Sequence, residues 1–112
     1  MKSRPAVGRA LQDAAPVFAA LGEDARLDIV SRLCEAGPLS ISRLAAGAGI
    51  SRQAVTKHLH ALASAGLICG ERRGRERIWR LEPGRLAEVQ GYLGQISAQW
   101  DDAIGRLRAF VP

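Results

Sequence analysis

The chain has 112 residues, of which 47% are hydrophobic and only 4% aromatic, with a formal net charge of +5. This length suits one domain with a modest core, and a core of Leu, Ala, Ile and Val favours helices. No apolar run approaches the roughly 20 residues that span a bilayer, and the N-terminus lacks an apolar signal core. We therefore expect a cytoplasmic protein that makes no membrane contact.

The N-terminal residues predict an arm followed by a short helix. Residues 1–10 contain three basic residues, a proline and a glycine, a composition typical of a flexible arm. We expect the folded domain to occupy residues 11–112. It begins with an apolar helix over Leu11–Leu21, which Pro16 either starts or interrupts.

A second helix is predicted from an N-cap at Asp24 to about Ala36, where a Gly-Pro pair ends it. Its expected inward-facing residues, at helical spacing, are Leu27, Val30, Leu33 and Cys34. We interpret Cys34 as a small core residue. Cys34 and Cys69 have no metal or disulfide spacing, and two thiols in a cytosolic chain are expected to be reduced.

A helix-turn-helix pattern follows. Ser40 caps a short third helix, whose end is predicted at Gly49. Its expected buried positions are Leu44, Ala45 and Ala48. Gly49 and the capping Ser51 predict a tight turn into the next helix. In this motif the second helix places its outer face in a DNA major groove.

The stretch SRQAVTKHLHALASAGL, residues 51–67, predicts an amphipathic helix with two different faces. The inner face consists of Ala54, Val55, His58, Leu59 and Leu62. The outer face consists of Arg52, Gln53, Thr56, Lys57 and His60, with no carboxylate among them. A solvated face usually mixes both charge signs, so this face favours an anionic partner. Arg and Gln can form paired hydrogen bonds with base edges, while Thr and Lys suit phosphates.

The two histidines of this helix are expected to have different environments. His58 lies one turn from Val55 on the inner face, so we expect a hydrogen-bonded core histidine. His60 points outward, as a neighbour of a phosphate or a base. The two imidazoles lie about 200° apart around the helix, so one metal ion cannot bind both.

Two strand-like runs, Leu67–Arg72 and Glu76–Leu81, come next. The tripeptide RGR between them supplies a glycine where a hairpin needs a positive φ. Residues 51–80 contain seven basic and two acidic residues, so the whole net charge lies in this segment. Such localisation is typical of a surface that binds a polyanion. A basic hairpin here predicts a winged helix-turn-helix, mainly α with a small β-hairpin wing.

A long C-terminal helix is predicted from about Pro83, which suits a first helical turn. Apolar residues recur at two positions of a seven-residue repeat. A helix of roughly 28 residues is about 42 Å long, longer than a small core can cover, so we expect the N- and C-terminal helices to form a homodimer. The predicted interface consists of Val17, Phe18, Leu21, Leu86, Val89, Leu93, Ile96, Trp100, Leu107 and Phe110.

The segments ALGEDARLDIVSRL, PLSISRLAAGAGISRQAVTKHLHALASAGLI and ERRGRERIWRLEP together resemble the ArsR family of bacterial winged-helix repressors, over about Val17–Leu81. The resemblance implies a homodimeric repressor of transcription that binds double-stranded operator DNA, an imperfect palindrome, until an inducer releases it. It implies that the DNA-reading positions are Arg52, Gln53, Thr56 and Lys57. The predicted DNA-binding residues are Ser51, Arg52, Gln53, Thr56, Lys57, His60, Arg72, Arg73, Arg75 and Arg77.

The chain departs from the metal-sensing members of that family. The segment LSISRLAAG lacks their Cys-Val-Cys motif, and the last helix has Asp101 and Asp102 but no histidine. We therefore expect no metal or other cofactor, and the residues identify no inducer. No phosphate loop or arrangement of nucleophile and base indicates an enzyme. Two alternatives stay open: a metal- or thiol-responsive sensor of the same family, and a winged-helix module that binds only proteins.

Overall fold

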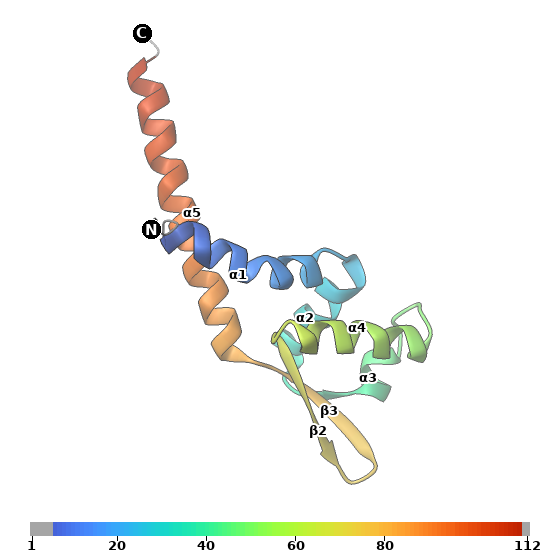
Figure 1. Cartoon of the computed structure of the whole chain (residues 1–112). Coiled ribbons are helices and arrows are strands. Elements are labelled where there is room, and N and C mark those ends of the chain that lie inside the picture. Colours follow the sequence, from blue (N-terminus) through green and yellow to red (C-terminus); the bar gives the residue numbers. More distant parts are fainter. Residues whose placement is uncertain (1–5, 111–112) are drawn as a thin grey trace.

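The computed structural model describes the backbone of residues 6–110 and the side chains of residues 12–110. The elements of this part are α1 (Ala6–Leu21), α2 (Asp24–Ala36), β1 (Leu39–Ser40), α3 (Ile41–Ala45), α4 (Arg52–Ser64), β2 (Ile68–Arg73), β3 (Glu76–Leu81) and α5 (Pro83–Phe110). Figure 1 shows the β2–β3 hairpin, here called the wing, and the outer half of α5 extending away from the other helices in opposite directions. The predicted winged helix-turn-helix, mainly α with a small hairpin, is confirmed.

Helix α1 begins earlier than predicted and passes through its proline. Its start lies before Leu11, so residues 6–10, which we expected in a flexible arm, are helical. Residues 1–5 of that arm lie outside the described part of the chain. Pro16 neither starts nor ends the helix, although it lacks the N–H that would bond the preceding turn. Packing of α1 on the core, where Val17 is fully buried, offsets that loss.

The inner face of helix α2 overlaps the predicted one only in part: Leu33 is buried and Val30 partly buried, as predicted. Ile29 and Leu33 are buried, whereas Leu27 is 50% exposed and Cys34 is exposed, so the prediction of these last two as core residues is wrong. Two apolar stripes run side by side on this helix, and contact with the rest of the chain selects one of them. Asp24 is the first helical residue, and the glutamate before it takes the N-cap position without a side-chain hydrogen bond.

Serine caps begin the two helices of the helix-turn-helix, as predicted. The Ser40 hydroxyl accepts a hydrogen bond from the backbone N–H of Arg43 (3.2 Å) at the start of α3. The Ser51 hydroxyl accepts one from the N–H of Ala54 (3.1 Å) at the start of α4. Each cap satisfies an N–H that the helix itself leaves without a partner. The first turn of α4 is therefore fixed in place.

A guanidinium from α2 holds the end of α3. This helix ends at Ala45 rather than at the predicted Gly49, which lies further along the turn with a positive φ of 74°. Arg32 donates hydrogen bonds to the carbonyl oxygens of Leu44 (2.8 Å) and Arg43 (2.7 Å). Helix ends leave such carbonyls without partners, and a planar guanidinium can reach two of them at once.

The sheet has a third strand that the sequence did not predict. Strand β1, Leu39–Ser40, pairs with β3, which gives the order β1-β3-β2. The wing is the predicted antiparallel hairpin. Its register pairs Arg73 with Glu76 and leaves a two-residue turn, in which Gly74 takes a positive φ of 63°. A glycine in this first turn position is typical of a type II′ hairpin.

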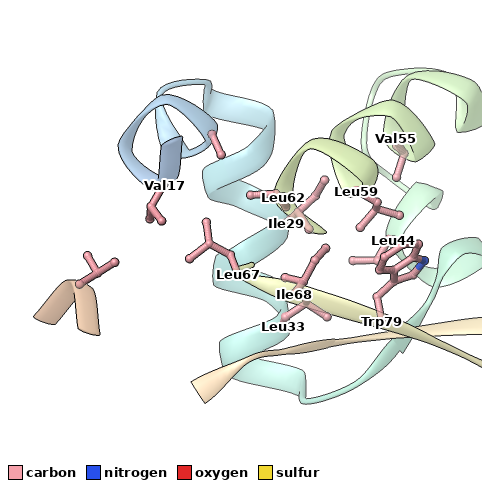
Figure 2. Close-up of a cluster of buried hydrophobic side chains, with 12 residues drawn as sticks. Val17, Ile29, Leu33, Leu44, Val55, Leu59, Leu62, Leu67, Ile68 and Trp79 are labelled. Atoms are coloured by element: carbon pink, nitrogen blue, oxygen red, sulfur yellow. The ribbon is translucent and has the colours of Figure 1, made fainter. Parts of the chain in front are cut away.

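The core is centred on the inner face of α4. Val55, Leu59 and Leu62 are at most 1% exposed. Figure 2 shows the side chains of Val55 and Leu59 near those of Leu44 and Trp79, and the side chain of Leu62 beside that of Ile29. Three side chains at helical spacing, once packed, prevent rotation of α4 about its axis.

His58 lies at the edge of this core, with 19% of its side chain exposed. Its Nδ1 accepts a hydrogen bond from Nε of Arg26 (3.1 Å) on α2. The carboxylate of Glu23 lies 3.5 Å from the same nitrogen. The predicted inward, hydrogen-bonded histidine is confirmed, and it connects α4 to the start of α2.

Helix α5 begins at Pro83, as predicted, and its inner half packs across α1 (Figure 1). The guanidinium of Arg85 donates to the carbonyl oxygen of Asp13 in α1 (2.9 Å) and to that of Ala65 at the end of α4 (3.4 Å). One side chain thus connects α5 with both helices, and the direction of α5 is tied to that of α4.

Part of the predicted dimer interface is buried within the single chain. Val17 is 0% and Val89 is 7% exposed, so neither can offer much surface to a partner, and their assignment to the interface is corrected. Leu21 and Leu86 are partly buried against the same core. The cause is the packing of α1 across the inner half of α5, which the seven-residue spacing alone does not reveal.

Removal of the Arg32 guanidinium should destabilise the fold. Arg32→Ala is expected to lower the free energy of unfolding by about 1 to 3 kcal/mol, because two charge-assisted hydrogen bonds are lost. Arg32→Lys should recover only part of this, since an ammonium has no planar fork. Urea unfolding measures both variants against Arg75→Ala, a control at an exposed arginine of the wing turn that is expected to change stability by less than about 0.5 kcal/mol. Equal stability of Arg32→Ala and the control would contradict the assignment.

Candidate nucleic-acid interface

The outer face of α4 presents its polar side chains on an open surface. Arg52, Gln53, Lys57 and His60 are exposed. One open depression is lined by Ser51, Gln53, Ala54, Thr56, Lys57 and His60. The helix contains no acidic residue along its length, and its N-terminal end carries the positive end of the helix dipole. An anion can therefore approach this face without meeting a carboxylate.

Local hydrogen bonds change the chemistry of two side chains on this face. The hydroxyl of Thr56 donates to the carbonyl oxygen of Arg52 (2.9 Å), so its proton is not directed at a phosphate. This leaves its methyl group for apolar contact, and the expected phosphate contact of Thr56 stays a prediction. Ser51 uses its oxygen as an acceptor in the cap, which leaves its proton free to be donated. The guanidinium of Arg52 donates a long hydrogen bond to the hydroxyl oxygen of Ser42 on α3 (3.5 Å).

The wing turns two arginines toward the same side as α4. Residues directly opposite each other on paired strands share a face, and here Arg72 is opposite Arg77 while Gly70 is opposite Trp79. Alternate residues of a strand also share a face, so all four lie together. The ring of Trp79 lies 6.1 Å from that of His60 on α4. Arg72 and Arg77 therefore extend the outer face of α4.

The other wing arginines lie elsewhere. Arg73 is on the opposite face of the hairpin, 3.9 Å from Glu71 and directly across from Glu76. These carboxylates reduce the positive potential that Arg73 contributes. Arg75 is exposed in the turn at the tip. The structure thus brings most of the predicted residues onto one surface and separates Arg73 from it.

Trp79, which the sequence did not single out, joins the two parts of this surface. Its ring is 2% exposed, and the guanidinium carbon of Arg77 lies 5.2 Å from the ring centroid. The available signal was the alternation of Arg77, Trp79 and Leu81, which places these residues on one face of a strand. Alternation does not say that this face meets α4.

Cys69 lies at the base of the wing. Its thiol donates a hydrogen bond to the carboxylate of Glu82 (3.3 Å), which also pairs with Arg80 (3.0 Å). Partial burial raises the pKa of the Cys69 thiol, and the hydrogen bond to Glu82 raises it further. A raised pKa leaves less thiolate at neutral pH and so lowers reactivity. Cys34 is the exposed thiol.

Across the described residues, no three His, Cys, Asp or Glu side chains come together as ligands for one metal ion. Metal independence stays a prediction, and titration of DNA binding with zinc tests it. None of the helices in this part of the chain combines the length and apolarity needed to cross a membrane.

A capped helix-turn-helix, an open basic face on α4 and an adjacent wing define a winged-helix DNA-binding protein. Residues 21–69 match the family described as a helix-turn-helix domain. The chain is 35% identical to the HTH-type transcriptional regulator Rv2034 of Mycobacterium tuberculosis, over 74% of this chain and 88% of that regulator. It is 32% identical to the HTH-type transcriptional repressor SmtB of the same species, over 84% of this chain and 67% of the repressor.

Among solved structures, the chain is similar to an ArsR-like transcriptional regulator from Rhodococcus sp. RHA1, with a TM-score of 0.77 and 34% identity. The similarity covers 92% of this chain and 96% of that one. The chain belongs to the ArsR family of winged helix-turn-helix transcriptional regulators. It is accordingly a DNA-binding regulator, and α4 occupies the place of the recognition helix in the motif.

The two thiols should react at different rates. Because the pKa of Cys69 is raised, its thiolate fraction at pH 7.5 is below that of an ordinary cysteine, and a disulfide reagent that releases a coloured thiol should react first with Cys34. Raising the pH toward 9.5 should accelerate the slow phase. Cys69→Ser should remove the slow phase and Cys34→Ser the fast one. A fast phase that survives in Cys34→Ser would contradict the assignment.

Proposed function

We propose that this regulator is a homodimeric repressor, whose two α4 helices enter successive major grooves of an imperfectly palindromic operator until an inducer releases them. The observation that carries the proposal is the outer face of α4, which has no carboxylate, together with Arg72 and Arg77 of the wing on the same side. The role is regulatory rather than enzymatic. Because operator DNA is the proposed partner, the protein acts in the cytoplasm.

Arg52 and Gln53 are the proposed readers of base edges. Both are exposed in the first turn of α4, and the N-terminal residues of a recognition helix are those that reach the bases. A guanidinium can form two hydrogen bonds with guanine, and a carboxamide two with adenine. Thr56 offers its methyl group to a thymine methyl, while Lys57 and the Ser51 hydroxyl suit phosphates.

The wing arginines supply affinity rather than sequence preference. Arg72 and Arg77 are directly opposite each other, and like charges in such a pair destabilise a free hairpin. A phosphate between them would remove the repulsion. Each phosphate neutralised in this way releases counterions, so the affinity should depend strongly on salt.

The proposed dimer contact is α5 from Leu93 to its end. Several of its large apolar side chains are exposed in the single chain. They are Leu93 (48%), Trp100 (67%), Ile104 (40%), Leu107 (63%) and Phe110 (86%). Soluble monomers rarely expose contiguous apolar patches larger than a few hundred Å². A second copy related by a two-fold axis would cover this surface with its equivalent, joined by Phe18 of α1, which is 38% exposed.

Dimerisation through α5 would also set the spacing of the operator. Arg85 ties α5 to α1 and to the end of α4, so the two-fold axis at α5 determines where the second α4 lies. Dimers of this motif bind half-sites about one helical turn of DNA apart, roughly 34 Å. The same contact that holds two copies together therefore aligns their recognition helices.

Base contacts and phosphate contacts should respond differently to mutation. Gln53→Ala should cost about 1 to 3 kcal/mol of binding free energy and relax the preference at one base pair of each half-site. Arg75→Ala should weaken binding to every sequence alike and reduce the salt dependence. Fluorescence anisotropy measures both on a duplex that the wild type selects from a random library, and on its single-base variants, at 50 and 200 mM salt.

In the same assay the wild type should lose about a hundredfold or more in affinity between the two salt concentrations, and micromolar zinc should release no DNA. Lack of binding to any duplex at 50 mM salt would favour a module that binds only proteins. An equal change of sequence preference in Gln53→Ala and Arg75→Ala would contradict the division between helix and wing.

Trp100 should contribute strongly to the dimer and little to the monomer fold. Its ring is 67% exposed in the single chain, so Trp100→Ala should leave the monomer folded but weaken dimerisation by about 2 kcal/mol or more, as for a buried interface anchor. Gln99→Ala, an exposed polar neighbour, is the control. Sedimentation equilibrium checks both, and a wild type that persists at 12.0 kDa at micromolar concentration would overturn the dimer.

A further inference from the structure

The side chains of His60, Trp79 and Arg77 lie together where the wing meets α4. The ring of Trp79 occupies the centre, with the imidazole of His60 6.1 Å from it and inclined by 47°. The guanidinium carbon of Arg77 lies 5.2 Å from the centroid of the same ring. A cation at this distance over an indole face is attracted by the electrons of the ring.

Gly70 makes room for this group. It is directly opposite Trp79 in the hairpin, and its φ is not among the positive ones, so backbone conformation does not require a glycine there. A Cβ atom at this position would lie 2.7 Å from Nε of Arg77 and 3.0 Å from two carbons of the Trp79 ring. Of these neighbours, Arg77 is exposed and able to move, whereas Trp79 is held in the core.

The position of the Arg77 guanidinium is unfavourable without a supporting contact. It stands opposite Arg72, and repulsion between the two cations would drive an unsupported guanidinium away from the shared face. A long exposed side chain also loses rotamer freedom when it binds a ligand. Stacking on Trp79 counters both effects before any ligand arrives.

We propose that Gly70 and Trp79 are positioning residues for DNA binding, which hold the Arg77 guanidinium on the side of the wing that faces the same way as the outer surface of α4. This inference rests on the proposed function, since it takes the partner to be a DNA phosphate. Gly70 contributes the space, and Trp79 contributes the surface on which the cation rests. The imidazole of His60 on α4 lies 6.1 Å from the same ring, so the ring lies between the wing and α4.

A double-mutant cycle on DNA affinity tests the proposal. Gly70→Ala, Arg77→Ala and the combined variant are compared with the wild type, by anisotropy on the duplex selected from a random library. Gly70→Ala should weaken binding by about three- to tenfold when Arg77 is present and by less than about twofold when it is absent, because coupled residues depart from additivity. Arg73→Ala, on the opposite face of the same hairpin, is the matched background, where Gly70→Ala should keep its full effect.

Replacement of Trp79 gives an independent arm that includes a rescue. Trp79→Tyr keeps an aromatic face for Arg77 and should retain most of the affinity, whereas Trp79→Leu should lose as much as Gly70→Ala does. Thermal melts establish that each variant is folded at the assay temperature. If Trp79→Leu does not fold, the cycle on Gly70, which leaves the core ring in place, decides the matter.

The outcomes separate the proposal from the function on which it rests. An equal loss from Gly70→Ala in the presence and absence of Arg77 would mean a purely structural effect and would overturn the positioning role. An unchanged affinity in Arg77→Ala would overturn both the Arg77 contact and the proposal, while binding through α4 stands. Failure of the wild type to bind any duplex at 50 mM salt would instead remove the proposed function itself.

Discussion

Burial of one face of α4 decides what the opposite face can do. Val55, Leu59 and Leu62 are packed in the core, and three side chains spaced three and four residues apart leave a helix no freedom to turn. The direction in which each outer side chain leaves the helix is thereby fixed. Two hydrogen bonds add to this effect. The Ser51 cap sets where α4 starts, and the bond from Arg32 to the end of α3 sets how α3 approaches α4.

The two faces of the wing differ in their electrostatics. Toward α4, Arg72 and Arg77 stand opposite each other with no carboxylate between them, an arrangement that weakens the isolated hairpin. On the far face, Arg73 lies beside Glu71 and across from Glu76. The carboxylates of the wing thus lower the positive potential only on the far face. The positive potential beside α4 is left unchanged. Local strain of this kind is expected where a partner supplies the missing charge.

Features determined by neighbouring residues could be predicted from the sequence: the two faces of α4, its serine cap, the hairpin turn and the start of α5. Features determined by distant contacts could not. Strand β1 is too short to show periodicity, and α1 continues through Pro16 because packing supports it. The repeat along α5 did not distinguish Val89, which packs inside the chain, from Trp100, which is exposed. At the site, polar spacing located the residues on α4, whereas Trp79 was missed because strand alternation does not reveal what lies opposite.

The outer half of α5 extends past α1 and is not packed against its own chain (Figure 1). If this half must dimerise for DNA binding, repression depends on the amount of protein in the cell. Below the dissociation constant of a dimer, its concentration varies with the square of the monomer concentration. Under the proposed function, operator occupancy at low levels follows that square, so one cell division without new synthesis lowers it about fourfold. Growth itself would then relieve repression, and a gene that repressed its own transcription would settle at an abundance set by how tightly two α5 helices pack.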